Sequence, residues 1–191
     1  MVDDGQMAHV SHAGRLLVAS PVIGDPNFER TVVLLLDHDG DGALGVVLNR
    51  PSDLAAAEVM PGWSDLAAQP GVVFSGGPVE QEGIIGLGRR SGQGPDGPFQ
   101  VTVGTIGVVD LSVEPIDVVG SVDGLRLFAG YAGWGEGQLE SELIGGGWWL
   151  ADADPADPLT DAPEGLWSTV IRRQPEPLRR WGFYPPDLSL N

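Results

Sequence analysis

The sequence predicts a single domain of mixed α/β type. Its 191 residues suit one compact domain, which would bury roughly 70% of the surface that the unfolded chain exposes. Short runs of β-branched and aliphatic residues recur along the chain as expected of strands, and two C-terminal stretches place apolar residues at helical spacing. We expect residues 1–13 to form a flexible N-terminal arm, residues 14–184 the domain, and residues 185–191 a C-terminal tail.

The first strands are predicted close to the start of the domain. Residues 15–19 are predicted to form a strand, and residues 31–36 are continuously apolar, as expected of a strand that is covered on both faces. Prolines and a glycine in residues 20–30 predict an irregular loop between them. The Asp- and Gly-rich residues 37–42 turn the chain into a further apolar run at residues 43–48, so the pattern predicts a hairpin.

The middle of the chain is predicted to alternate short elements. Ser52 is placed to cap a short helix over residues 53–60, which Pro61-Gly62 ends. Residues 72–74 and 84–88 have the apolar content of two further strands.

The C-terminal half is predicted to combine strands with two helices. Residues 110–123 stay open between a short helix and a turn. Leu139, Leu143 and Ile144 share one face of a predicted helix, which a run of three glycines ends. Five of the six tryptophans lie in the C-terminal third and are expected to fill the core. Strands are predicted at residues 100–109, 125–129 and 148–151, and helices at residues 138–144 and 166–172.

A junction rich in glycine and aromatic residues precedes the first of these helices. Glycines at positions 130, 133, 135 and 137 permit positive φ or close backbone approach, while Tyr131 and Trp134 supply large surfaces with one polar group each. Such a junction either packs tightly or holds a ligand. Glu136 and Glu140 stabilise the start of the helix and make it a poor phosphate site.

The charge of the chain disfavours anionic partners. Ten arginines, no lysine and 27 acidic residues give a net charge of −17, which repels nucleic acids and anionic membranes. The paired arginines at 89–90, 172–173 and 179–180 are expected to be solvated charges at helix ends or in loops instead of a nucleic-acid site. The acidic, polar N-terminus differs from a signal peptide, and we expect a cytoplasmic protein without a membrane segment.

We expect neither a cofactor nor a metal. The absence of cysteine removes disulfides, thiolate nucleophiles and cysteine-rich zinc sites. Asp37, Asp39 and Asp41 match the first half of a calcium-binding loop, but Leu48 stands where that loop needs a bidentate glutamate. An Asp-Gly turn in a hairpin explains the same residues.

Several motifs taken together resemble the AlgH/YqgE family of bacterial proteins. They are Asp25-Pro26-x-Phe28-x-Arg30, Asn49-Arg50-Pro51, Gly76-Gly77-Pro78-Val79, Gly130-Tyr131-Ala132-Gly133-Trp134, Gln138-Leu139-Glu140-x-Glu142 and Trp149. The resemblance implies a mixed α/β domain whose sheet bifurcates and curls into a pseudo-barrel covered by helices, in a cytosolic protein. The family has no established reaction, and its members are often described as transcriptional regulators. Gly88 stands where many members have a histidine, so no mechanism that uses that imidazole is implied here.

The candidate binding residues come from these motifs. We expect a non-enzymatic protein that binds a protein partner or a small ligand of unknown identity. The alternative is an enzyme with a dispersed polar site, in which Arg50 binds an anion and Glu140 or Glu142 acts as a general base. Direct DNA binding is a third, less favoured reading, and the arginines and glycines could also be purely structural. The candidates are Asp25, Arg30, Asn49, Arg50, Gly76, Gly77, Gly130, Tyr131, Gly133, Trp134, Gln138, Glu140 and Glu142.

Overall fold

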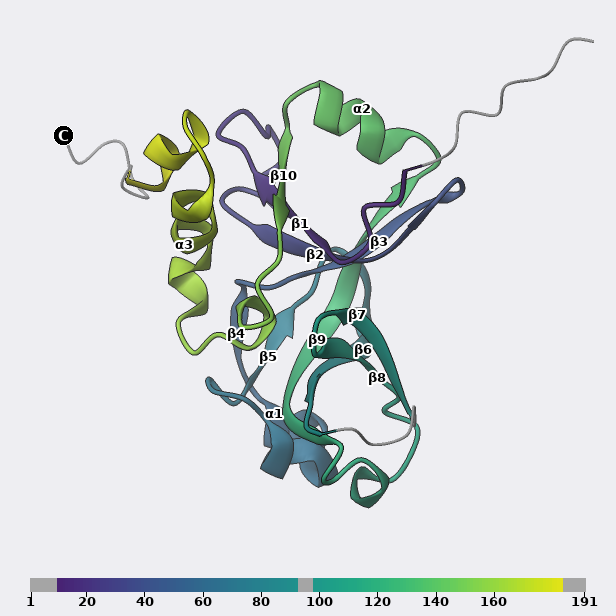
Figure 1. Ribbon diagram of the computed structural model, residues 1–191. Helices are drawn as coiled ribbons and strands as arrows, with labels where there is room; N and C mark the ends of the chain where they lie inside the picture. Colours follow the sequence, from purple (N-terminus) through teal and green to yellow (C-terminus); the bar gives the residue numbers. More distant parts are fainter. Residues whose placement is uncertain (1–9, 93–97, 184–191) are drawn as a thin grey trace, which may run out of the picture.

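The strand β9 (Val122–Gly135) joins the two halves of the molecule. The computed structural model describes residues 10–92 and 98–183, and within them ten strands form one branched sheet (Figure 1). The main path runs β10, β1, β2, β3, β9, β6, β8, β7, while β5 pairs with both β4 and β9. The remaining strands are β1 (Arg15–Ala19), β2 (Val32–Asp39), β3 (Gly42–Val47), β4 (Pro51–Ala55), β5 (Val72–Ser75), β6 (Val79–Arg90), β7 (Phe99–Val103), β8 (Ile106–Val109) and β10 (Trp148–Asp152).

The sheet divides along β9. Near its C-terminal end β9 pairs antiparallel with β3, with Gly42 opposite Gly135 and Gly45 opposite Ala132. Further back it pairs antiparallel with β6 and, at Phe128 and Ala129, parallel with β5. The result is a single mixed α/β domain whose sheet bifurcates and curls into a half-barrel, as predicted.

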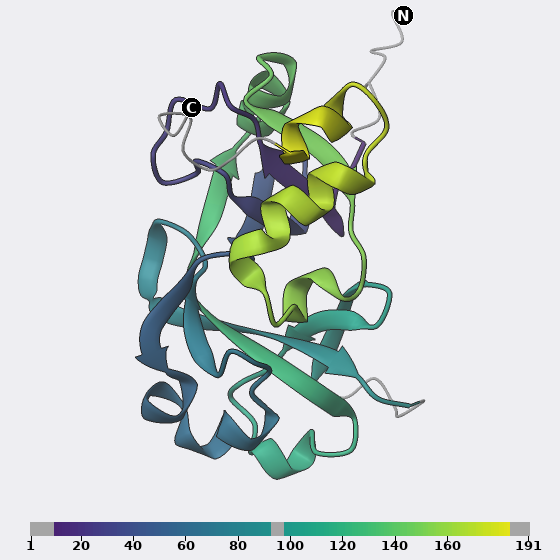
Figure 2. The same cartoon turned by 90° about the vertical axis from the view of Figure 1, so that its left-hand side faces the viewer.

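The upper strands, as drawn in Figure 1, are β10, β1, β2 and β3, and helices cover both faces of this part of the sheet. Besides α1 (Ala56–Val59), the helices are α2 (Gln138–Ile144) and α3 (Leu166–Arg173), with short 3-10 helices at Pro61–Leu66, Pro115–Asp117, Asp157–Leu159, Pro163–Gly165 and Leu178–Phe183. Figure 2 shows α3 lying across the upper strands. Among the described residues, no helix is long and apolar enough to span a membrane.

Alternate residues of the upper strands enter two separate cores. Leu16 and Leu34 pack with Trp167 of α3, whereas Leu17 and Val33 pack with Leu139 of α2. All four strand residues are fully buried. This arrangement explains why β1 and β2 are almost continuously apolar, because each face of these strands is covered by its own helix.

The structure corrects three local predictions. The helix predicted over residues 53–60 is shortened to α1 at Ala56–Val59, and residues 53–55 belong to strand β4, because the Ser52 hydroxyl donates to the Val73 carbonyl of β5 instead of capping a helix. The single strand predicted at 100–109 is the hairpin β7–β8, which turns at Gly104 with φ +56°. The strand predicted at 125–129 is longer and includes most of the glycine junction, since β9 runs to Gly135 and only two residues separate it from α2.

Candidate functional site

The loop between β1 and β2, the end of β9 and α2 enclose an open hollow with an aromatic floor. We call it the aromatic groove, and its volume is about 360 Å³. Gly133, Trp134, Gln138 and Glu142 reach it from the predicted junction and helix, and Asp25 reaches it from the loop. The complete lining is Val22, Ile23, Gly24, Asp25, Phe28, Gly133, Trp134, Gln138, Glu142, Gly145, Gly147 and Trp148.

Three rings form the floor of the aromatic groove. The Trp148 ring meets Phe28 edge-on with centroids 5.3 Å apart, and it meets Trp134 edge-on at 6.0 Å. Phe28 and Trp134 lie nearly parallel at 6.4 Å. Edge-on and offset arrangements are those that aromatic pairs prefer, so the rings hold one another in place. Trp148 was predicted only as core, because nothing in the sequence shows that one edge of the core opens here.

Glu142 holds the two indoles of this floor. Its Oε2 accepts hydrogen bonds from Trp134 Nε1 at 2.9 Å and Trp148 Nε1 at 2.8 Å, and its Oε1 accepts one from Gln138 Nε2 at 2.9 Å. All three donors are neutral. The Glu142 side chain is half-buried beside the rings.

Two further hollows adjoin the aromatic groove. The first, about 440 Å³, shares Gly133 and Trp134 with it and contains Tyr131, with carboxylates from Asp37, Asp39 and Asp41 of the β2–β3 hairpin. The second, about 270 Å³, shares Phe28 and contains Arg50, Ser75 and Gly77. Arg50 also donates to the Glu29 carbonyl. These candidates therefore line three neighbouring hollows and do not converge on one catalytic pocket.

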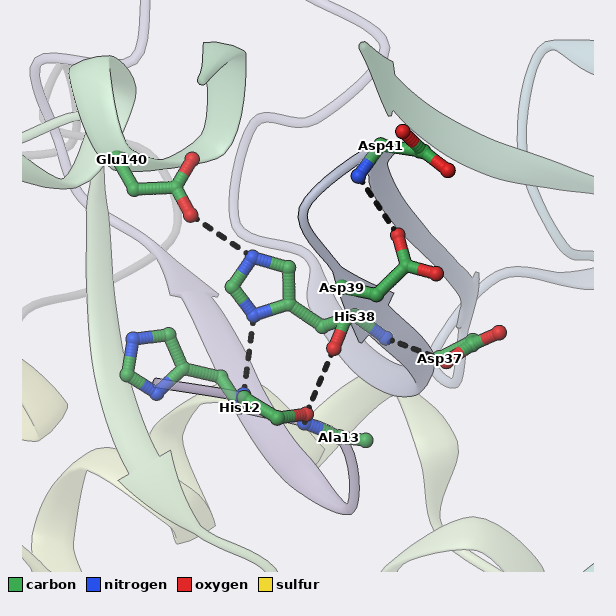
Figure 3. A network of polar contacts seen from close by, with 8 residues as sticks. His12, Ala13, Asp37, His38, Asp39, Asp41 and Glu140 are labelled. Carbon is green, nitrogen blue, oxygen red and sulfur yellow. Dashed lines mark hydrogen bonds and ion pairs between the residues drawn. The ribbon is translucent and has the colours of Figure 1, made fainter. Parts of the chain in front are cut away.

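Glu140 faces away from these hollows and contacts a buried histidine (Figure 3). His38 of β2 is 3% exposed, and its Nε2 lies 2.9 Å from Glu140 Oε1. The His12 backbone N–H donates to His38 Nδ1 at 3.0 Å, so Nδ1 carries no hydrogen in this arrangement and Nε2 donates to Glu140. The contact ties α2 to β2. Of the predicted arm, residues 1–9 lie outside the described part, as does the tail at 185–191.

The hairpin carboxylates serve as turn residues. Asp39 Oδ1 accepts from the Asp41 backbone N–H, and Asp37 Oδ1 accepts from the His38 backbone N–H. Within residues 10–92 and 98–183, no group of three or more histidine or acidic side chains is arranged to hold a metal.

Arg30 and Asn49 act within the scaffold. Asn49 is 5% exposed, accepts from the Val32 N–H and donates to the Arg30 carbonyl, which fixes the entry into β2. The Arg30 guanidinium lies 4.1 Å over the Trp167 ring, and burial lowers its pKa while neighbouring Glu29 opposes the shift. Neither side chain lines the aromatic groove.

Gly76, Gly77 and Gly130 allow two backbone segments to cross in contact. A Cβ on Gly76 would lie 2.2 Å from the Gly130 carbonyl oxygen, and one on Gly77 would lie 2.1 Å from the Tyr131 carbonyl carbon. Gly130 has φ +70° and the same crowding from the other side. These glycines are required by packing, and of the three only Gly77 lines a hollow.

Sequence reasoning missed a buried arginine in the lower half. Arg126 of β9 is 2% exposed, donates to the carbonyls of Gln69 and Pro158, and lies 4.3 Å over the Phe74 ring. Burial lowers its pKa to about 10, and Asp161 partly offsets this effect. The sequence signal that could have revealed this buried arginine is its position within the apolar residues 125–129.

The half-barrel and the open groove beside β9 are those of a single-domain mixed α/β protein. The chain belongs to the AlgH-like family (DUF179), whose model matches residues 16–179. This confirms the resemblance predicted from the sequence.

Similar proteins span nearly the whole chain. UPF0301 proteins of Streptomyces avermitilis and Mycobacteroides abscessus are 49% and 43% identical, covering 95% and 98% of this chain and 96% and 93% of theirs. A crystal structure of a Corynebacterium diphtheriae protein has a TM-score of 0.87 at 31% identity, covering 93% of this chain and 94% of that one. The solution structure of the AlgH protein from Pseudomonas aeruginosa has a TM-score of 0.66 at 29% identity, covering 97% and 98%.

Proposed function

We propose that this chain is a non-enzymatic binding protein of the bacterial cytoplasm, and that the aromatic groove holds its protein partner or small ligand. The observation that carries the proposal is the groove itself, in which Phe28, Trp134 and Trp148 form a fixed floor around Glu142. Rigid aromatic surface with a few placed polar groups is typical of binding sites. A regulatory role would act through the partner.

The arrangement of polar residues favours binding over catalysis. The enzyme reading needs Arg50 beside Glu140 or Glu142. Instead Arg50 lines the hollow behind Phe28, Glu140 contacts His38, and Glu142 is held by two indoles. An anion-binding group and a general base must meet at one substrate atom, and these three side chains lie in different places.

One member of each arginine pair is bound to an acidic residue. Arg89 pairs with Asp123, Arg173 with Asp157, and Arg180 with Glu176. Together with the net charge of −17, these contacts support a protein that does not bind DNA directly. A mobility-shift titration at low salt tests this, and a complex formed there would contradict it.

Site-specific crosslinking tests the groove. Gly24 lines it, and a Cβ at that position meets nothing within 4 Å, so a photoreactive benzoylphenylalanine fits there. Gly165, before α3, offers the same space away from the groove and serves as the matched control. After irradiation in a lysate of the bacterium that naturally makes this protein, we expect crosslinked adducts with a partner or ligand from position 24 and not from position 165. The same pattern at both positions, or none, would refute the proposal.

A further inference from the structure

We infer that the aromatic groove receives an arginine side chain from a peptide segment of a partner protein, with Glu142 and Asp25 as its counter-charges. The inference rests on the proposed function, because it names the chemistry of what the groove binds. Charge, aromatic geometry and the exposed apolar rim each support it.

The charge of the groove is negative and not balanced within it. Its described lining contains the carboxylates of Asp25 and Glu142 and no basic side chain. Glu142 accepts only from the neutral groups of Trp134, Trp148 and Gln138. A half-buried carboxylate without a cation beside it attracts one, since the pair is screened less there than on an open surface.

The aromatic rings favour a guanidinium over an ammonium group. A guanidinium is planar, weakly hydrated and stacks on aromatic faces, whereas an ammonium is compact and strongly hydrated. The protein already uses this contact twice, with Arg30 at 4.1 Å over Trp167 and Arg126 at 4.3 Å over Phe74. In the groove Trp134 and Trp148 are only 7% and 3% exposed, so the partly exposed ring of Phe28 is the one that offers a third arginine this contact, in the groove that also contains the Glu142 carboxylate.

The rim favours a peptide segment over a free small cation. Val22, in the lining, is 75% exposed, and Ile144, next to the lining residue Gly145, is 89% exposed. Apolar side chains on either side of the arginine would cover them. The adjoining hollow with Asp37, Asp39 and Asp41 shares Trp134 with the groove, so a second basic residue of the segment meets further negative charge. The net charge of −17 favours such a basic segment over an acidic one.

A pair of synthetic peptides tests the inference with the whole chain. The probe is acetyl-Leu-Arg-Leu-Arg-Leu-amide, and the control carries citrulline, the neutral isostere of arginine, at both basic positions. In NMR titrations the indole N–H signals of Trp134 and Trp148 report on the site, because both groups donate to Glu142. We expect both signals to move with the arginine peptide. We expect affinity to be roughly two- to tenfold lower for the citrulline peptide, the range of a partly desolvated cation contact.

Protein variants separate the parts of the inference. Glu142→Gln and Asp25→Asn remove charge but keep acceptors, and each is expected to weaken the arginine peptide by roughly two- to tenfold without weakening the citrulline peptide. Glu58→Gln, at an exposed position of α1, is the matched charge control and should change nothing. Gly24→Trp fills the groove and should abolish both indole shifts, whereas Gly165→Trp should not.

Other outcomes would contradict the arginine site, the peptide nature of the occupant or the proposed function. Equal affinity for the two peptides, or binding unaffected by Gly24→Trp, refutes the arginine site. If methylguanidinium alone binds as tightly as the peptide, the occupant is a small cation and not a peptide segment. If position 24 crosslinks to a partner while the arginine peptide fails to bind, the proposed function stands and this inference falls. If both experiments fail, both fall.

Discussion

Replacing Arg126 with methionine is expected to lower the free energy of unfolding by about 3 kcal/mol. Methionine fills similar space but cannot donate to the carbonyls of Gln69 and Pro158 or lie as a cation over Phe74. The side chain is 2% exposed, so water cannot take over the lost contacts inside the domain.

The expected size comes from opposing effects. The two hydrogen bonds from a charged donor contribute about 1.5–3 kcal/mol each. The contact with the ring adds about 2 kcal/mol when it is desolvated. Against this, the cost of burying the charge, which lowers the pKa to about 10, corresponds to about 3 kcal/mol and is removed with the arginine. The contacts outweigh that cost by a few kcal/mol.

Urea denaturation at neutral pH measures the difference. Arg180→Met is the matched control, because Arg180 is exposed and pairs only with Glu176 four residues earlier. Such a pair is worth about 0.5 kcal/mol or less, so the control should unfold almost like the parent. If Arg126→Met is as stable as the parent, the contacts of Arg126 do no more than compensate for burying its charge, and the reasoning is wrong.

Alkaline pH gives an independent check on the same residue. The pKa of Arg126 is lower in the folded protein than in the unfolded chain, so above about pH 10 the unfolded state binds more protons. The contribution of Arg126 to the free energy of unfolding therefore rises with pH in that range. At lower pH the burial of its positive charge opposes folding. The difference in unfolding free energy between parent and Arg126→Met should become larger above pH 10. A difference that shrinks there would contradict the pKa shift.

Further predictions concern the crossing point and α2. Gly130→Ala should lower the unfolding free energy by about 3 kcal/mol or more, because φ is +70° and its Cβ would lie 2.7 Å from a carbonyl oxygen, while Gly135→Ala, with open space around it, should cost under about 1 kcal/mol. Glu142→Ala should cost about 2–4 kcal/mol in the same assay by leaving two indole N–H groups without their acceptor, and a loss equal to that of Glu142→Gln would contradict this. Glu140→Ala should speed hydrogen exchange in α2 by loosening its tie to His38; unchanged exchange would show that the tie does not hold the helix.

The elements that could be predicted are those whose cause is local. β1 and α2 have the predicted residues, because an apolar run and a one-face pattern ended by glycines leave few alternatives. Ser52 misled because its hydroxyl bonds a strand distant in sequence, which a local capping rule cannot anticipate. The glycines from 130 to 135 left the end of the strand undefined for a related reason. Glycine suits both a ligand-binding junction and a close approach of two strands, and only the position of Gly76 and Gly77 decides between them.

Some residues selected from the motifs lie close together. Trp134, Gln138, Glu142 and Asp25 line the same groove. The role of Glu142 as acceptor for two indoles could not be predicted, because it depends on how α2 sits between β9 and β10. Asn49 was selected for its polarity, and it instead completes the backbone hydrogen bonding at the start of β2. Polar type alone does not separate a ligand contact from a scaffold contact.

The position of β9 in the sheet bears on how the protein is made. β3 is synthesised early, yet its second neighbour is the far end of β9, with Gly42 opposite Gly135. Until that part leaves the ribosome, the β2–β3 hairpin keeps an unpaired apolar edge and lacks both covering helices. Such an edge is a substrate for chaperones and for aggregation. Slowing translation before β9 should lengthen this vulnerable interval, whereas slowing it after α3 should not.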